Sequence, residues 1–416
     1  MKRYSILLVA LLLLSAPATQ LAAAGARASG RAVEALTKYL ASPTDKRSPL
    51  AEQEFSKTAL TVDDAQSAGA LLWKDHQAII RATRKAEMDA RRIKVGDLEM
   101  PFYYKIFGDK PKQGRSLYFS LHGGGGTTQQ VNDQQWNNQK GLYQPAEGVY
   151  LVPRAPTNTW NLWHQGHIDG MFDRLIENLV VFEGVNPNRV YLMGYSAGGD
   201  GVYQLGPRMA DRWAAASMMA GHPNDSSPLS LRNTGFSIQV GGQDSAYNRN
   251  KVAAQWGERL KQLKADDPEG YPHMVKIYPN KGHWMDLEDR IAVPWMAKFT
   301  RNPVPPSIVW HQDDVAHSRF HWLSVAGESR KGRSQIRASY KDQQITLATS
   351  SVPEVTFRLN DGMMDLDKRI TVTHDGELLF TGTVERSIQV IARTLAERGD
   401  PASLFSAEVT VTLPGQ

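Results

Sequence analysis

Between residues 100 and 299, short apolar runs alternate with stretches of helical character. Each run is apolar on both faces and ends near Gly, Pro or Asp, which is typical of strands buried on both sides. Amphipathic stretches such as MFDRLIENLVVF lie between the runs. This alternation predicts an α/β fold over residues 96–302, with a mostly parallel sheet flanked by helices. The clearest apolar runs are SLYFSL, GVYLVP, RVYLM, AAASMM, FSIQVG and MVKIY.

The segment before this domain, residues 25–95, divides into two parts. Residues 25–60 are polar and rich in Ala, Ser and Pro, and we expect them to be loose. Residues 62–93 follow a helical pattern, and Thr61 is suited to cap the helix N-terminus. We expect this helix to pack on the next domain; a partner-binding helix is the alternative. Its apolar stripe consists of Ala68, Leu72, Ile79, Ala82 and Ala86.

After residue 302 the pattern changes to alternating apolar and polar positions. TRNPVPPSIVW, residues 300–310, contains three prolines and predicts a linker. The runs QIRASYK, QITLATS, EVTFRLN and AEVTVTL then alternate with a period of two, as half-buried strands do. Asp375-Gly376 between two such runs is a hairpin signal, and one helical stretch covers residues 387–399. We therefore expect a separate β-rich, sandwich-like domain over residues 303–416.

Residues 1–24 have the organisation of a secretory signal peptide. Lys2 and Arg3 precede the apolar run ILLVALLLL, and the small residues of LAAAGA suit cleavage. We expect an exported protein, periplasmic or secreted, from a bacterium, with no stable membrane span after removal of the signal; a retained membrane anchor is the alternative. The chain has no cysteine, which excludes disulfides, thiol catalysis and cysteine-ligated zinc.

Composition and charge change this picture little. Hydrophobic residues make up 41% of the chain, which is enough for a large core. The formal net charge of +5 is small for 416 residues, and no run of Lys and Arg interleaves with aromatic residues. We therefore expect no nucleic-acid partner.

The stretch GYSAGGD, residues 194–200, follows the predicted strand RVYLM and precedes an amphipathic stretch. G-x-S-x-G between a strand and a helix is the nucleophile-elbow pattern, in which small neighbours let the backbone take a strained turn that exposes the serine. Ser196 is therefore a candidate nucleophile. A plain turn residue is the alternative.

A serine needs a histidine to take its proton, and the histidine needs a carboxylate to orient it. Asp244 follows the run FSIQVGG, and His283 follows MVKIYPNKG, so both lie after predicted strands in the order Ser, acid, His. The acid has alternatives nearby: Asp266, Asp267, Asp286 and Asp289. Upstream, backbone N–H groups of the loop in LHGGGG, together with that of Ala197, are suited to bind a developing oxyanion.

The motifs LHGGGG, GYSAGG, GGQD and GHW, in this order, resemble those of α/β-hydrolase esterases, in particular secreted polyhydroxybutyrate depolymerase-like and feruloyl-esterase-like enzymes. The resemblance covers residues 102–299, about half of the chain. It implies Ser196 as nucleophile, His283 as general base and Asp244 as the acid that orients it. Such depolymerases often carry cysteines around the loop and elbow, and this chain has none.

The resemblance also implies an oxyanion hole built from Ala197 and from Gly124 or Gly125. The glycine run itself is more similar to that of lipase-type esterases. No metal and no organic cofactor is implied.

Polar and aromatic side chains follow the predicted strand GVYLVP. We expect residues 154–170 to form a substrate wall or lid, with Trp160, Trp163 and His164 as candidate substrate contacts. His164 with His167 and Asp169 is the alternative, a metal site. Further candidate contacts are His122, His222 and Trp284.

Together these features predict an exported serine hydrolase that cleaves small or polymeric carboxylic esters through an acyl-enzyme. Two alternatives stay open. One is a serine peptidase of the same fold, and the other is a non-catalytic protein whose β-rich domain binds a surface or polymer.

Overall fold

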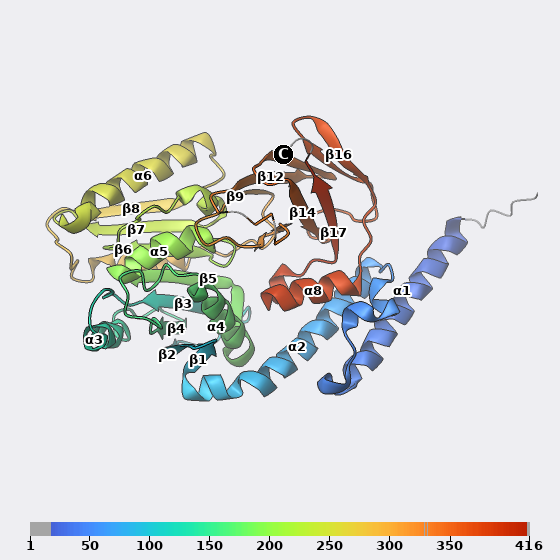
Figure 1. Ribbon diagram of the computed structural model, residues 1–416, viewed down its shortest axis with the longest axis horizontal. Helices are drawn as coiled ribbons and strands as arrows, with labels where there is room; N and C mark the ends of the chain where they lie inside the picture. Colours follow the sequence, from blue (N-terminus) through green and yellow to red (C-terminus); the bar gives the residue numbers. More distant parts are fainter. Residues whose placement is uncertain (1–17, 328, 331, 414–416) are drawn as a thin grey trace, which may run out of the picture.

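The structure is a computed structural model that describes residues 18–413 except 328 and 331. Residues 1–17, most of the predicted signal peptide, lie outside the described residues. Figure 1 shows an α/β domain at the left, a second β-rich part beside it, and two long helices, one along the lower side and one at the right.

An eight-stranded sheet forms the centre of the α/β domain, in the order β1-β2-β4-β3-β5-β6-β7-β8. β1 and β2 run antiparallel to their neighbours, and all pairings from β4 to β8 are parallel. This order, with β2 antiparallel, is that of the α/β-hydrolase fold, so the predicted fold class is confirmed. The strands are β1 Arg92–Val95, β2 Leu98–Phe107, β3 Arg115–Leu121, β4 Gly148–Pro153, β5 Val185–Tyr195, β6 Ala215–Met219, β7 Gly235–Gly241 and β8 His273–Tyr278.

Helices cover both faces of this sheet. Leu117 and Phe119 of β3 enter a core shared with α4, α5 and α6, whereas Tyr118 between them enters a second core with α3 and α7. Both faces of the strand are therefore buried, which explains its continuous apolar run. The helices are α3 Gln129–Gln139, α4 His167–Glu183, α5 Ala197–Arg208, α6 Arg249–Asp266 and α7 Ala292–Met296. Short 3₁₀ helices, η4 Pro228–Asn233, η5 Ala246–Asn248 and η6 Glu288–Ile291, lie in the connections.

The N-terminal segment is ordered, so the expectation that residues 25–60 are loose is wrong. It forms the helix α1 Ala18–Ala41 and three 3₁₀ turns, η1 Thr44–Lys46, η2 Leu50–Glu52 and η3 Glu54–Lys57. Ala32 and Leu36 of α1 are buried in a small core with Leu72 of α2 and Ile388 of α8. Alanine is the best helix former, so this composition favours a helix wherever a partner covers one face.

The helix predicted over residues 62–93 is present as α2, Val62–Ala90. The Thr61 side chain accepts a hydrogen bond from the Asp64 N–H at 3.2 Å, as expected of an N-cap. The helix ends at Arg91, whose φ of 53° is left-handed, and the chain then turns into β1. The predicted helix therefore extends too far at its C-terminal end, since Ile93 is a buried residue of a strand.

Two sheets make up the C-terminal part, with the strand orders β10-β11-β14-β17 and β16-β15-β13-β12-β9. Asp375 and Gly376 both have positive φ and join β15 to β16, so the predicted hairpin is confirmed. The strands are β9 Ser307–His311, β10 Arg319–Phe320, β11 Leu323–Ser324, β12 Gln335–Lys341, β13 Gln344–Ser350, β14 Glu354–Leu359, β15 Ile370–His374, β16 Glu377–Gly382 and β17 Ala407–Thr412, with α8 Ile388–Arg398 and η7 Pro401–Ser403 before the last.

The predicted linker is too long, because β9 begins inside it. β9 contains Ile308, Val309 and Trp310, which are buried and pair with β12. Of the predicted linker, only residues 300–306 therefore remain outside a strand. Pro306 is the last proline of the predicted linker, and the apolar residues Ile308, Val309 and Trp310 follow Ser307.

Buried ion pairs join the C-terminal part to the α/β domain. Arg301 Nη2 lies 2.6 Å from Asp400 Oδ2, and Arg212 Nη1 approaches the same oxygen at 3.7 Å. All three side chains are nearly inaccessible to solvent. The contact is therefore fixed by charges that have no access to water.

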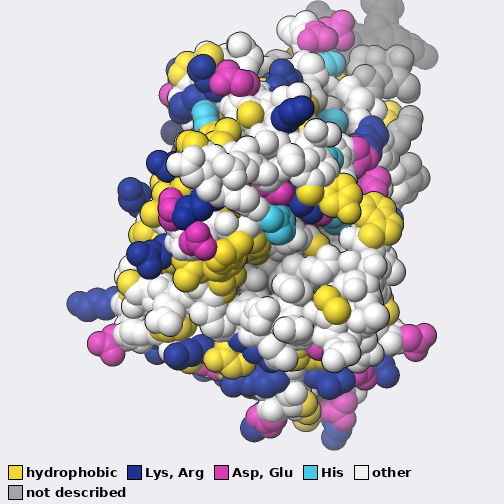
Figure 2. Space-filling view, turned by 90° about the vertical axis from the view of Figure 1, so that its left-hand side faces the viewer, with side chains coloured by type: hydrophobic (Ala, Val, Ile, Leu, Met, Phe, Trp, Pro, Cys, Tyr) yellow, Lys and Arg dark blue, Asp and Glu magenta, His cyan; other side chains and the backbone are white. Residues whose placement is uncertain are grey.

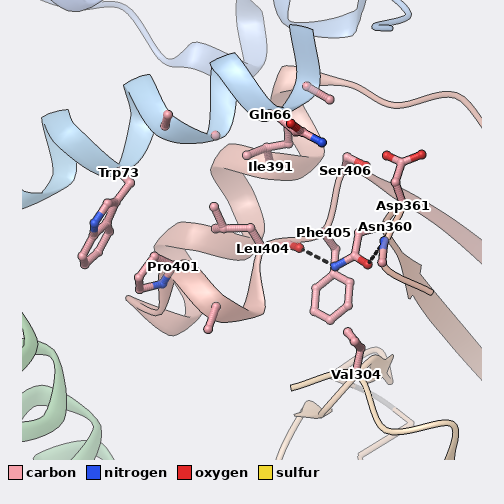
Figure 3. A pocket seen from close by; sticks show the side chains of 15 residues that line it. Gln66, Trp73, Val304, Asn360, Asp361, Ile391, Pro401, Leu404, Phe405 and Ser406 are labelled. Carbon is pink, nitrogen blue, oxygen red and sulfur yellow. Dashed lines mark hydrogen bonds between the residues drawn. The ribbon is translucent and has the colours of Figure 1, made fainter. Parts of the chain in front are cut away.

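A cavity of about 440 Å³ lies where α2, α8 and the loop before β17 meet. Figure 3 shows Trp73, Ile391 and Leu404 in its wall. None of the residues that line it is among the candidates for chemistry.

Outer surfaces carry mixed side chains. Figure 2 shows hydrophobic, histidine and oppositely charged side chains intermingled on the side that lies at the left of Figure 1. Among residues 18–413, no helix combines the length and apolar character that crossing a bilayer requires. The large hydrophobic side chains that remain exposed include Trp160, Tyr247 and Trp284.

Candidate active site

Ser196 occupies a strained turn between β5 and α5. Its φ of 60° and ψ of −123° lie outside the regions that non-glycine residues ordinarily adopt. Glycines make the turn possible: a Cβ on Gly194 would lie 2.2 Å from the Gly198 carbonyl oxygen, and one on Gly198 would lie 2.2 Å from that of Leu121. The Ser196 N–H donates to Met219 O on the neighbouring strand at 2.9 Å.

Asp244 and His283 lie beside this serine, as the order of the motifs predicts. His283 Nδ1 is 2.7 Å from Asp244 Oδ2, and His283 Nε2 is 3.0 Å from Ser196 Oγ. Because the carboxylate can only accept, Nδ1 carries the proton, and Nε2 is left to accept from the serine hydroxyl. The structure thus brings the three predicted residues into one hydrogen-bonded chain.

The other carboxylates considered for this position have different partners. Asp289 accepts from the Tyr143 hydroxyl, Asp286 pairs with Lys281, and Asp267 pairs with Arg232. Asp266 accepts from Gln262 on its own helix. Asp244, by contrast, is almost wholly buried next to His283.

Tyr195 supports the histidine, a role that the sequence reasoning missed. Its hydroxyl donates to His283 O at 2.7 Å and accepts from the Met285 N–H at 3.0 Å. Burial raises the pKa of Tyr195, so the phenol stays protonated. The only sequence signal is its place directly before the serine. Trp284, a candidate substrate contact, packs on Tyr195 with ring centroids 5.5 Å apart and stays half exposed.

The glycine loop after β3 approaches Ser196, but its N–H groups are not equivalent. Gly125 donates to Asn132 Oδ1 at 2.9 Å, so of the two glycines proposed for an oxyanion hole, Gly125 has its N–H already engaged. The N–H groups of Gly124 and Ala197 have no acceptor among the described residues. Gly124 has a φ of 102°, and a Cβ there would lie 2.4 Å from Asn132 Oδ1. The backbone therefore needs glycine at this position.

Asn132 is the second residue that sequence reasoning missed. It lies fully buried on α3, and its Nδ2 donates to the carbonyl groups of Thr127 and Thr128. With its bond to Gly125, it connects both ends of the loop.

His122 and Trp163 lie behind this loop and are fully buried, so the prediction that they contact substrate is wrong. His122 Nδ1 donates to Gly123 O, its Nε2 accepts from the Ala155 N–H, and Trp163 Nε1 donates to His122 O. Burial lowers the pKa of His122 to about 3, which keeps the ring neutral. Both residues are therefore structural: through these hydrogen bonds they fix the backbone at the start of the glycine loop.

A cavity of about 260 Å³ opens beside Ser196. Trp160 and His222, two of the candidate substrate contacts, lie in its wall, whereas His164 packs edge-on beneath Trp160. Its full lining is Gly124, Gly125, Trp160, Ser196, Ala197, Asp200, His222, Asn224, Tyr247 and Arg249. The wall of this cavity therefore combines polar side chains, such as Asp200 and Arg249, with the aromatic side chains of Trp160 and Tyr247.

Two of these polar groups are connected. Asp200 Oδ1 accepts from the His222 N–H at 2.6 Å. Burial raises the pKa of Asp200, although that bond and the nearby Arg249 oppose the shift.

Asp169 does not act with His164 and His167 as a ligand set. It pairs instead with Arg208 at 2.6 Å and with His317 at 2.8 Å. Across residues 18–413, apart from 328 and 331, no group of three or more His, Asp and Glu side chains is arranged to hold a metal ion.

No protein-family model matches the chain, and no curated protein matches it. Among solved structures, a thermostable esterase is 17% identical, with a TM-score of 0.40, over 50% of this chain and 62% of that chain. A carboxylesterase of Bacillus cereus is 14% identical, with a TM-score of 0.35, over 53% and 98% of the two chains. The fluorophosphonate-binding serine hydrolase F of Staphylococcus aureus is 12% identical, with a TM-score of 0.35, over 50% and 96%. This chain thus spans less than two thirds of the thermostable esterase, and its fold assignment rests on the strand order given above.

Proposed function

We propose that this protein is a serine hydrolase of carboxylic esters, with Ser196 as nucleophile, His283 as general base and Asp244 as the orienting acid. One observation carries the proposal: a serine on a strained elbow, with a histidine at 3.0 Å whose other nitrogen lies 2.7 Å from a buried carboxylate. A turn that served only to join a strand to a helix would not need this arrangement.

The reaction uses groups of this chain at each step. His283 Nε2 takes the Ser196 proton as Oγ attacks the ester carbonyl carbon. The N–H groups of Ala197 and Gly124 bind the oxyanion that forms. The carbon–oxygen bond then breaks, and His283 protonates the leaving alcohol. Water, deprotonated by the same histidine, attacks the acyl-serine and releases the acid.

Asp244 stays ionised throughout. It holds the imidazole in the tautomer that leaves Nε2 free and stabilises the imidazolium that forms. The burial of Asp244 suits this role, because a carboxylate that is itself shielded from solvent attracts the imidazolium more strongly.

We further propose export through the N-terminal signal, as residues 1–24 predict. Mass spectrometry of protein recovered outside the cytoplasm would find a mature N-terminus near residues 21–26. Full-length protein confined to the cytoplasm would contradict this.

The test of the hydrolase is active-site labelling by a fluorophosphonate probe, with peptide mapping, beside turnover of short nitrophenyl esters. We expect label on Ser196 in the wild type and none in Ser196→Ala, with turnover reduced by about 10⁴-fold or more in Ser196→Ala and His283→Ala. Ser120→Ala, a buried serine on β3 outside the site, is the control and keeps the label. Near-wild-type turnover in either site variant contradicts the proposal, and turnover of amides in preference to esters favours a peptidase.

A further inference from the structure

Arg249 lies in the wall of the cavity that opens beside Ser196. It is the first residue of α6, and its side chain is 13% exposed. The proposed reaction has no use for this cation. Few cations are buried to this extent without a strong partner, because removing a charge from water is costly.

The guanidinium group is only weakly paired. Its one ion pair among the described residues joins Nη1 to Asp244 Oδ1 at 3.5 Å, the long end of hydrogen-bond distances. Asp244 makes its short bond, at 2.7 Å, to His283 instead. The Nε of Arg249 is buried and has no hydrogen-bond partner among the described residues. An arginine has five N–H donors, so most of its binding capacity is unused.

The other groups around Arg249 do not satisfy it. Asp200 lines the same cavity, but its Oδ1 accepts from the His222 N–H, and no ion pair joins it to Arg249. Burial raises the pKa of Asp200, and the nearby Arg249 opposes that shift without forming an ion pair with the carboxylate. The Tyr247 ring lies with its centroid 4.9 Å from the Arg249 Cζ, a contact that leaves the in-plane donors free.

We propose that Arg249 binds a carboxylate carried by the substrate, so that the preferred esters are acidic, such as the half-esters of short dicarboxylic acids. This inference rests on the proposed ester hydrolysis. Planar guanidinium and carboxylate groups pair through two parallel hydrogen bonds, and such pairing gains strength in a partly buried site.

The rest of the cavity fits a small acid of this kind. Its volume of about 260 Å³ lies below the roughly 300–1,000 Å³ of ordinary ligand pockets. Trp160 and Tyr247 are 66% and 76% exposed and stand in its wall, where their rings can cover the carbon chain between the two carboxyl groups.

The competing interpretation is that Arg249 only orients Asp244. Steady-state kinetics on acidic and neutral esters distinguishes the two roles of Arg249. A substrate-binding arginine lowers the KM for acidic esters and leaves their neutral analogues less affected, whereas an orienting arginine affects kcat for both alike.

The experiment compares monoethyl and diethyl esters of malonic, succinic, glutaric and adipic acid, with acid release followed by titration. We expect the wild type to favour the monoethyl ester at one chain length. Arg249→Gln should reduce that preference in kcat/KM by about tenfold or more, mainly through KM, and Arg249→Lys should restore part of it. Lys251→Gln removes an exposed cation of the same helix and is the control that keeps the preference.

Hydrolysis of the diesters with no preference for any monoester overturns this inference alone. An equal loss of kcat for both kinds of ester in Arg249→Gln and Arg249→Lys overturns it in favour of the orienting role. Hydrolysis of neither kind, with no fluorophosphonate label on Ser196, overturns the proposed hydrolase as well.

Discussion

Asn132 holds the glycine loop beside Ser196 through its buried side-chain amide. One buried amide accepts from the Gly125 N–H and donates to Thr127 O and Thr128 O, so all its hydrogen bonds serve this loop. With Gly125 engaged, the loop keeps the N–H of Gly124 free for an oxyanion. The position of that donor therefore depends on a side chain that touches no substrate.

We predict that Asn132→Ala lowers kcat for neutral esters by about 10- to 100-fold and changes KM little, because a misplaced oxyanion donor acts on the transition state. Steady-state kinetics on the nitrophenyl esters checks this. Asn138→Ala removes an exposed amide further along α3 and is the matched control. A rise in KM at constant kcat would show that the loop binds substrate rather than the transition state.

His321 connects stability to pH. It is partly buried directly after β10, where its surroundings lower its pKa to about 4 through loss of contact with water, with Asp211 opposing and nearby arginines adding to the shift. A histidine in the unfolded chain titrates near 6.5, so the unfolded state binds the proton more readily. The neutral ring therefore stabilises the fold fully above pH about 6.5, and this contribution is lost as the pH falls toward 4.

We predict that the free energy of unfolding falls between pH 7 and 4, by roughly 3 kcal/mol from His321 alone. His321→Asn removes the titration and suits the positive φ of 50° at this position. Urea denaturation at several pH values should give a shallower pH slope in the variant. Absolute stability also changes because the side chain is smaller, so only the slope tests the idea. An unchanged slope would contradict it.

The turn between β5 and α5 carries Ser196, so the geometry of the site depends on it. Gly198 faces the backbone of β3, and a Cβ there would lie 2.2 Å from Leu121 O, which cannot move without breaking the sheet. We predict that Gly198→Ala lowers the free energy of unfolding by about 3 kcal/mol and abolishes labelling of Ser196. Denaturant titration and the fluorophosphonate probe measure the two effects.

Gly170 of α4 provides the comparison within the same domain. It is exposed, and a Cβ there would meet no atom within 4 Å. Gly170→Ala should raise the free energy of unfolding by about 0.5–1 kcal/mol through helix propensity. Equal effects of the two substitutions would show that the elbow tolerates a side chain.

Elements buried on both sides could be predicted from the sequence, because such strands read as continuous apolar runs. The elbow and the order of Ser196, Asp244 and His283 could also be predicted, since each of the three follows a strand: β5, β7 and β8. α1 could not, because its alanines and polar residues show no apolar run and its burial depends on α8, which lies over 300 residues away.

The sequence does not show in which direction a loop side chain points, and this limited the prediction of substrate-contacting residues. Trp160 and Trp163 belong to the same polar, aromatic loop, yet Trp163 is fully buried and Trp160 is exposed, and His122 at the start of the glycine loop is fully buried as well. Sequence order alone does not distinguish these cases.

Tyr195 was missed because its partners, His283 and Met285, lie about 90 residues later in the chain. Asn132 was missed although its partners are local, because nothing in the sequence shows that its side chain turns back onto the loop before its helix.

The α/β domain and the C-terminal part are joined by charges that neither could bury alone. Arg301, from the short connection, donates to Asp400 before β17 and also to Asn188 Oδ1 of β5. Burial alone would raise the pKa of Asp400, but Arg301 and Arg212 hold it down at about 2. The carboxylate is therefore ionised in the interior, and its stability there depends on the two arginines.

Removing Arg301 should thus uncouple the two parts. We predict that Arg301→Met lowers the free energy of unfolding by about 3–5 kcal/mol, because Asp400 then keeps the hydrogen bonds from Ser403 and the Ala402 N–H but, as a cation, only Arg212 at 3.7 Å. Arg301→Met combined with Asp400→Leu should recover part of this loss, since no unpaired charge remains buried. In calorimetry, we expect one transition for the wild type and two for the single variant, with the C-terminal part melting first. A single transition with unchanged midpoint would mean that the apolar contacts across the junction suffice to hold the two parts together.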